Sequence, residues 1–479
     1  MRRRNAYLAY IGRALTLAGF DHAERRAASV LELERRLAQR QMPAEQSASD
    51  SNAEHHWTLP DFTRKAPGLD WATLFRSTNL EREATIVAWQ PAALTGLAAQ
   101  IGATPISVWQ DYFRFHVLDR FAGVLPSAFD SAASVFHQAL GSAPLAPRDA
   151  RAIDATRVSL AEAIGVLYTD RWFSAAQKQR IQAVVANVAT AFRRRIETVA
   201  WMTPAARTIA LAKLRRLYIG IGYPEQRPDF HDLDIDPRDA LGNVRRLDDH
   251  NRRLVLGRVG RPVDWTAWSM TPQTVGAILV FQQNSYDFTA ALLQPTKFDS
   301  TASLAALYGS IGAIIGHDIS HYVDPLGAEY DTTGARRRWW SVEDVGGYAL
   351  MAEPLVRQFS AYRPFPDLPL DGNRMRGENV ADLAGLTAAF EAWRSEAGKS
   401  AMDAASLHRG DREFFLAWAA AWRTKMTDTD LRTRIAGDDH APEPYRVDTV
   451  RNLDAWYPAF EVQPTDRLYL APAARVRVW

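Results

Sequence analysis

The sequence contains no cysteine among its 479 residues. This absence excludes disulfide bonds, cysteine nucleophiles and zinc sites with cysteine ligands. The chain also lacks any stretch of 18 consecutive apolar residues, so we expect no membrane span. Neither sign of charge predominates, because 57 basic and 55 acidic residues give a net charge of +2. This balance argues against a nucleic acid as the partner.

The apolar residues that are present follow mostly helical spacing. Residues 25–41 form an amphipathic pattern, and residues 71–250 read as successive helices. Residues 43–56 are polar and predict a loop. Short β segments are expected at 275–281 and near 287–292. We therefore predict a mainly α fold with small β segments, and a chain of this length is expected to form two lobes.

Residues 317–321 read His-Asp-Ile-Ser-His. Two histidines four apart on a helix lie on one face, so their imidazoles can share a zinc ion at roughly 2.0–2.1 Å. In the standard form of this pattern a glutamate between them is the general base. Asp318 carries the same carboxylate on a side chain that is one methylene shorter. Such a pair alone is more often structural, but the apolar stretch before it predicts a buried helix, where imidazoles need partners.

A second helix is predicted at residues 374–393, with Glu378 and Asp382 four apart on one face. Two such carboxylates alone would most often face solvent. Zinc sites in enzymes, however, commonly combine two histidines with one glutamate and leave a fourth position open. A metal-bound histidine also normally donates its other N–H to a carboxylate. Glu378 fits the role of the third metal ligand, and Asp382 fits the role of the carboxylate that accepts the histidine N–H.

These motifs resemble the neprilysin and endothelin-converting-enzyme family of zinc metallopeptidases. The family signature is GHExxHxxD, then GENxADxxGL, then DxHxPxxxR, and the chain has GHDISHYVD, GENVADLAGL and DDHAPEPYR. Similar stretches are LAEAIGVLY at 160–168 and WMTPAARTIALAKL at 201–214. NSYDFTAALLQPTKFD at 284–299 resembles the family pattern NxIxFPAxILQPPFF.

The resemblance implies one Zn²⁺ ion as the cofactor, with His317, His321 and Glu378 as its ligands. It also implies that Asp382 orients a ligand histidine, and Asp324 is a weaker candidate for the same task. The fold it implies is a two-lobed zincin-type metallopeptidase fold with a cleft between the lobes. On this basis we expect a catalytic zinc lobe from residues 1–66 plus 251–479, and a helical capping lobe from residues 67–250.

The resemblance assigns the remaining chemistry to five positions. Asp318 stands where the family has its general base, His440 would stabilise the oxyanion, and Arg446 would bind a substrate carbonyl. The family's substrate-binding Asn-Ala pair falls at Gly276 and Ala277, and Gly276 has no amide with which to hold a peptide. Such a lost hydrogen bond costs about 0.5–1.5 kcal/mol, whereas a misplaced base costs roughly 10²–10⁴-fold in rate.

The resemblance also bears on the start of the chain. Residues 4–20 resemble a helix from well inside the family's first domain, so we expect the beginning of that domain to be absent. Family members usually carry a membrane anchor or a signal peptide before it. We expect a cytoplasmic location for this chain, or a secreted or periplasmic one if the chain has been trimmed.

Three functions are compatible with an intact zinc shell and altered peptide chemistry. The first is a metallohydrolase that acts on an amide bond of a peptide or a peptide-like small molecule, with altered or reduced peptidase activity. The second is a zinc enzyme repurposed in a biosynthetic pathway for condensation, cyclisation or elimination. The third is a zinc-binding pseudopeptidase without activity.

Overall fold

The computed structural model describes residues 2–295 and 297–479 and divides into two compact units. The first unit comprises Met1–Leu160 and Asp229–Pro262, and the second comprises Ala161–Pro228 and Val263–Trp479. Helices predominate in both units, and the strands are few and short. This composition confirms the predicted mainly α fold with small β segments.

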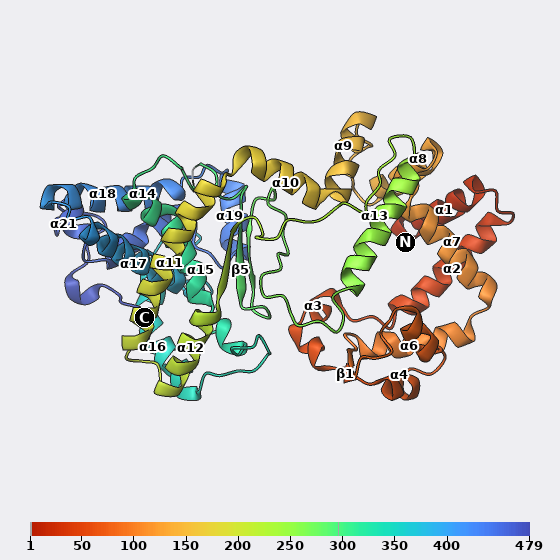
Figure 1. Ribbon diagram of the computed structural model, residues 1–479, viewed down its shortest axis with the longest axis horizontal. Coiled ribbons are helices and arrows are strands. Elements are labelled where there is room, and N and C mark those ends of the chain that lie inside the picture. Colours follow the sequence, from red (N-terminus) through yellow and green to blue (C-terminus); the bar gives the residue numbers. More distant parts are fainter. Residues whose placement is uncertain (1, 296) are drawn as a thin grey trace. The chain divides into compact units, whose positions relative to one another are not determined.

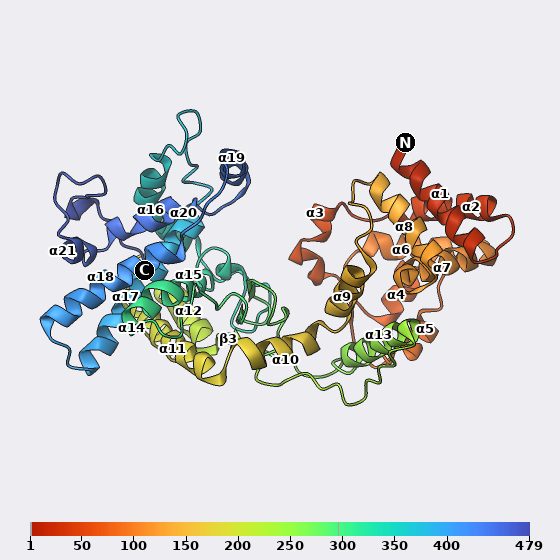
Figure 2. The ribbon, with the colours of Figure 1, turned by 90° about the horizontal axis from the view of Figure 1, so that it is seen from above.

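The first unit is a helical assembly with one two-stranded sheet. Its elements are α1 (Arg2–Leu17), α2 (Ala23–Ala38), α3 (Ala44–Ser47), η1 (Asp50–Glu54), β1 (His56–Trp57), α4 (Leu59–Lys65), α5 (Trp71–Ser77), β2 (Ile86–Val87), α6 (Pro91–Ala103), α7 (Ile106–Arg120), η2 (Ala122–Val124), α8 (Ser127–Ala139), α9 (Arg148–Ser159) and α13 (Ala240–Leu256). One of its cores forms where α1, α2 and α7 pack together (Figure 2), burying Ile11, Val30 and Phe115. Residues 43–56 are not the continuous loop that their polarity predicts, because α3 and η1 form there.

The second unit contains a three-stranded sheet and a larger set of helices. Its elements are α10 (Ala161–Trp172), α11 (Ala175–Thr198), α12 (Pro204–Arg216), β3 (Tyr218–Gly222), β4 (Ala277–Val280), β5 (Ser285–Thr289), α14 (Leu304–Leu307), η3 (Tyr308–Gly312), α15 (Ala313–His321), η4 (Gly327–Glu329), α16 (Val342–Ser360), α17 (Arg376–Lys399), α18 (Ala404–Ala421), α19 (Asp428–Gly437), α20 (Glu443–Val447), η5 (Asp448–Asn452), α21 (Trp456–Phe460) and η6 (Pro472–Ala474). In its core α15 and α11 pack against α17 (Figure 1), burying Phe192, Ile315 and Leu386.

The strands of the second unit are ordered β3-β5-β4. β5 is the central strand, with all five residues buried, and runs parallel to β3 and antiparallel to β4. β4 and β5 confirm the two expected β segments, whereas β3 (YIGIG) was not predicted. β4 is an edge strand of this sheet, so one side of its backbone faces away from β5.

The division into units differs from the expected lobe boundaries. The first 66 residues belong to the first unit rather than to the unit that holds the zinc motif. They do so because α1 and α2 bury their apolar faces against α7 and α8. Residues 161–228 belong to the second unit, because α11 and α12 bury side chains such as Val188 and Leu214 in its core. The helical stretch at 71–250 is therefore shared between the two units.

No helix in the described part of the chain combines the length and the apolar character that a membrane crossing requires.

Candidate metal centre

The site is built where α15 and α17 lie against one another, and two glycines allow their close approach. A Cβ atom on Gly385 of α17 would lie 2.2 Å from the backbone nitrogen of His317, and one on Gly316 of α15 would lie 2.8 Å from the Cα atom of Gly385. Neither position can therefore carry a side chain without moving backbone. The contact brings His317 next to Glu378 and Asp382, which occupy the first two turns of α17.

Three side-chain atoms converge at this contact. The Nε2 atoms of His317 and His321 are 3.2 Å apart, and they lie 3.1 Å and 3.3 Å from Oε2 of Glu378. Ligand atoms arranged tetrahedrally at roughly 2.0–2.1 Å from a zinc ion are about 3.3 Å apart. The three residues together form a group that could hold a metal ion. Both the donor types and their spacing fit one Zn²⁺ ion, and the structure brings together the three ligands that were predicted.

The other ring nitrogen of each histidine is held by a buried aspartate. Nδ1 of His317 is 2.8 Å from Oδ1 of Asp382, and Nδ1 of His321 is 2.7 Å from Oδ2 of Asp324. A carboxylate in this position keeps the proton on Nδ1 and leaves Nε2 free to bind a metal. Asp324 also accepts a hydrogen bond from the backbone amide of Leu326, at 2.8 Å. The structure therefore places Asp324 in the same type of contact as Asp382.

Arg446 is a buried partner of Asp382. Its Nε donates to Oδ2 of Asp382 at 2.8 Å and its Nη2 donates to Oδ1 at 2.6 Å, while its guanidinium carbon lies 3.7 Å from the ring centre of Trp422. Burial alone would raise the pKa of the Asp382 carboxyl, but Arg446 and His317 lower that pKa to about 2. Asp382 therefore stays ionised, which suits an acceptor for His317. The predicted contact between Arg446 and a substrate carbonyl stays a prediction.

Asp318 is buried at this site, with 8% of its surface exposed, and burial raises the pKa of its carboxyl. Tyr286, from β5, lies near this carboxylate, and burial together with the charge of Asp318 raises the pKa of the tyrosine hydroxyl. The sequence reasoning missed Tyr286, although a signal was present. The family pattern NxIxF has isoleucine at this position, so a polar group stands where an apolar one is usual. Two departures from the family pattern thus lie near each other.

His440 contacts one of the three ligands, Glu378. Its Nε2 is 2.9 Å from Oε2 of Glu378, and its Nδ1 is 2.9 Å from Oδ1 of Asp438. Burial lowers the pKa of His440, but hydrogen bonds with Glu378 and Asp438 raise it above the ordinary value overall. The role of Asp438 was not predicted, although the first position of DxHxPxxxR marks it.

Gly276 immediately precedes β4, and Ala277 is the first residue of that strand. The carbonyl oxygen of Gly276 accepts hydrogen bonds from the backbone amide and the hydroxyl of Thr289 on β5, at 3.3 Å and 2.8 Å. Ala277 pairs with Phe288 of the same strand. The pair is thus anchored to β5, the strand that carries Tyr286.

Comparison with known proteins gives a consistent picture. Residues 2–224 match the N-terminal family model of peptidase family M13. Residues 279–476 match a second model of the same family. Among solved structures, the chain is similar to the zinc metalloprotease Zmp1 of Mycobacterium tuberculosis in its open state. That similarity has a TM-score of 0.90 and 32% sequence identity, and it covers 99% of this chain and 76% of that one.

Two curated relatives extend the comparison. The chain is 29% identical over 426 residues to the neutral endopeptidase of Lactobacillus helveticus, covering 88% of this chain and 64% of that protein. It is 27% identical over 490 residues to the human endothelin-converting enzyme-like 1, covering 99% of this chain and 63% of that protein. The chain therefore spans less than two thirds of the length of these two relatives.

Proposed function

The chain belongs to peptidase family M13, and we propose that it is a zinc-dependent hydrolase of an amide bond in a peptide or a peptide-like small molecule. The observation that carries the proposal is the convergence of His317, His321 and Glu378, with the second nitrogen of each histidine bonded to a buried aspartate. We further propose that peptidase activity is altered or reduced, because Asp318 replaces the family's glutamate.

The residues around the ligands supply the remaining steps. A zinc ion held by these ligands would polarise the scissile carbonyl and make an attacking water more acidic. Asp318 then takes the proton from that water and passes it to the leaving amine. His440 donates a hydrogen bond to the carbonyl oxygen as negative charge develops on it. Arg446 maintains Asp382 in its ionised form and thereby holds the ring of His317.

The edge strand β4 supports a peptide as the substrate. An extended peptide can add to an exposed strand edge through backbone hydrogen bonds alone. Gly276 provides no side-chain amide to reinforce this pairing, so we expect backbone contacts from Ala277 onward to carry most of the binding.

A second candidate function keeps the zinc ion and changes the reaction. The proximity of Tyr286 to Asp318 favours it, because a hydroxyl in that place can compete with water for the carboxylate that should act as base. Condensation, cyclisation or elimination in a biosynthetic pathway would use the zinc ion without hydrolysis. A catalytically inactive zinc-binding pseudopeptidase is the third possibility.

The test is cleavage of a mixed library of short quenched peptides by the zinc-loaded protein. We expect cleavage that a chelator abolishes and added zinc restores, with no cleavage by His321→Ala under the same conditions. If the native protein binds one zinc ion but cleaves no peptide in the library, the proposal is wrong and the second or third function is favoured.

A further inference from the structure

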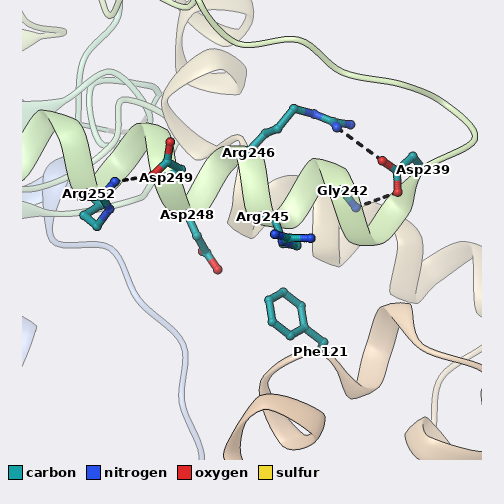
Figure 3. Close-up of a pocket in the computed structure, with 8 residues that line it drawn as sticks. All are labelled: Phe121, Asp239, Gly242, Arg245, Arg246, Asp248, Asp249 and Arg252. Atoms are coloured by element: carbon teal, nitrogen blue, oxygen red, sulfur yellow. Dashed lines mark hydrogen bonds and ion pairs between the residues drawn. The ribbon is translucent and has the colours of Figure 1, made fainter.

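Arginines line several pockets of the molecule, and two of these pockets differ in how the arginine charges are compensated. The larger pocket, of about 670 Å³, lies along α13 in the first unit (Figure 3). Arg246 pairs there with Asp239 at 3.3 Å, and Arg252 pairs with Asp249 at 2.6 Å. Three arginines and three aspartates line it. This pocket therefore presents no net charge to a ligand.

The second pocket, of about 390 Å³, lies wholly in the second unit and adjoins the metal centre. Its wall includes Glu378 and Asp324, so a substrate bound at the metal centre can reach it directly. Leu326 and Val345 supply apolar parts of the wall, and Arg376 lies on the same wall at the start of α17.

Of the three arginines that line this second pocket, Arg338 pairs with Glu329 at 3.1 Å. Arg374 and Arg376 have only a distant carboxylate partner or none among the described residues. Nη2 of Arg376 donates to Oδ1 of Asn373 at 2.7 Å, and Arg376 forms no ion pair with any residue that the structure describes. Both Nη atoms of Arg374 donate hydrogen bonds to backbone carbonyls. Its carboxylate contact is between its Nε and Oδ1 of Asp439, at 3.7 Å. The carboxylates of Asp324 and Glu378 are directed at the metal-site histidines. The two pockets have the same balance of arginines and carboxylates, but in this one the guanidinium of Arg376 is left without an ion pair among the described residues.

Two further features favour an anion in this pocket. Trp340 and Tyr348 line it with 6% and 3% of their surfaces exposed, and neither the indole Nε1 nor the hydroxyl has a hydrogen-bond partner among the described residues. Buried donors of this kind are unfavourable unless a ligand or water satisfies them. The 24-residue helix α17 also begins here, with Gly377 in the pocket wall and no side chain capping its first turn. The positive end of its dipole attracts negative charge.

We propose that this pocket is a substrate subsite for a carboxylate group, and that Arg376 is the residue that binds it. The carboxylate can belong to an acidic side chain or to the C-terminus of a peptide. A guanidinium can bind a carboxylate through two parallel hydrogen bonds, which makes arginine selective for this group. The inference rests on the proposed peptidase function, since it names a class of substrate for the same site.

The test measures binding rather than turnover. Zinc-loaded full-length protein carrying Asp318→Asn is titrated with fluorescent peptides in which one Glu, or a Gln at the same place, is moved along the sequence. Each peptide is made with a free and with an amidated C-terminus. We expect one acidic position, or the free C-terminus, to bind about tenfold more tightly than its neutral counterpart. A difference between the Glu and Gln peptides identifies an acidic side chain as the source of the carboxylate. A difference between the free and amidated peptides identifies the C-terminus.

Variants of Arg376 then show whether the preference belongs to this pocket. Arg376→Gln should reduce the tenfold ratio to about twofold or less, and Arg376→Lys, which keeps the charge, should retain part of it. The control is Arg357→Gln, because Arg357 is exposed on α16, pairs with Glu353 and lies outside the pocket. It should leave the ratio unchanged. Zinc content and thermal unfolding of each variant establish that it is folded.

The proposal is wrong if Arg376→Gln keeps the full ratio while folded, or if the protein with Arg376 distinguishes no acidic peptide from its neutral counterpart. Cleavage of the same peptides by the native chain separates this failure from that of the proposed function. Cleavage without charge preference overturns the subsite alone. Binding that depends on Arg376 without cleavage of any peptide overturns the peptidase function alone.

Discussion

Asp382 beside the metal centre and Asp287 on β5 are both buried aspartates, with 1% and 0% of their surfaces exposed. Asp382 accepts hydrogen bonds from Arg446 and His317, and its pKa is lowered to about 2. Among the described residues, neither carboxylate oxygen of Asp287 has a hydrogen-bond partner, and the backbone amide of Ser269 only partly offsets the effect of burial on its pKa. Burial raises the pKa of Asp287 to about 7.

The difference shows that burial alone does not determine the state of a carboxyl group in this protein. Around the metal ligands His317, Asp382 and Arg446 are matched by partners of opposite charge or by hydrogen bonds, so their charges depend on one another. The strand side of the same unit contains a buried acid without such a partner, and it carries Gly276, which has no side-chain amide. We therefore expect changes beside the metal to affect zinc binding, and changes on the strands to affect stability and substrate binding.

The largest effect is expected at the ligands themselves. Glu378→Ala or His321→Ala removes one of three protein ligands, so zinc content should fall from about one ion per chain to nearly none. Metal analysis of the purified variants measures it. Asp287→Asn is the matched control on the strand side and should keep its zinc. Unchanged zinc content in both ligand variants would contradict the assignment of the site.

Asp382→Ala should weaken zinc binding by about 10–100-fold, because His317 loses the acceptor that orients its ring. It should also lower the free energy of unfolding by about 3–5 kcal/mol, because Arg446 remains buried without its partner. Competition with a chelator and urea unfolding measure the two effects. The double variant Asp382→Ala/Arg446→Met should recover part of the stability but not the zinc affinity. Recovery of both would mean that Asp382 acts only on packing.

The pH dependence of stability should reveal Asp287. Because its folded pKa of about 7 lies above the ordinary value of about 3.9, the folded chain keeps a proton that the unfolded chain releases between these pH values. Asp287 therefore makes the free energy of unfolding fall as the pH rises from about 4 to 7. Asp287→Asn cannot ionise, so at pH 8 it should be more stable than the native chain by about 2 kcal/mol. An equal difference at pH 5 and pH 8 would contradict this account.

The smallest effect is expected at Gly276. Gly276→Asn supplies an amide that can bind a peptide backbone, which should lower KM by about two- to tenfold. The new Cβ would lie 2.7 Å from the terminal methyl of Met270, a flexible side chain that can move aside. Gly276→Ala adds the same Cβ without the amide and serves as the control. If both variants change KM equally, the amide has no role.

The metal ligands could be predicted from the sequence because helical spacing alone sets how His317 and His321 project, and the motif of Glu378 lies on a single helix. The contact between Asp382 and His317 could be predicted as well, because Asp382 lies one turn after Glu378 on the same helix. These residues depend on local periodicity and on one helix contact, and both leave a direct pattern in the sequence.

Other features could not be predicted because they arise from tertiary packing. Tyr286 lies near Asp318 but belongs to a strand. Arg376 lines a pocket together with Tyr348, which lies on a different helix, and Trp340, which lies in a loop. The unit boundaries likewise depend on where α1, α2, α11 and α12 bury their apolar faces. Each of these helices is amphipathic or apolar. That pattern shows that one face is buried but not which other helix it packs against.

The central claim is that Asp318 serves as a working base beside a bound zinc ion. The most direct test compares the rate of peptide cleavage by the zinc-loaded native chain, Asp318→Asn and Asp318→Glu, with zinc content measured in each. We predict that the native chain cleaves and that Asp318→Asn, with its zinc retained, is slower by at least about 100-fold. Equal rates for the native chain and Asp318→Asn, or cleavage by Asp318→Glu alone, would contradict the claim.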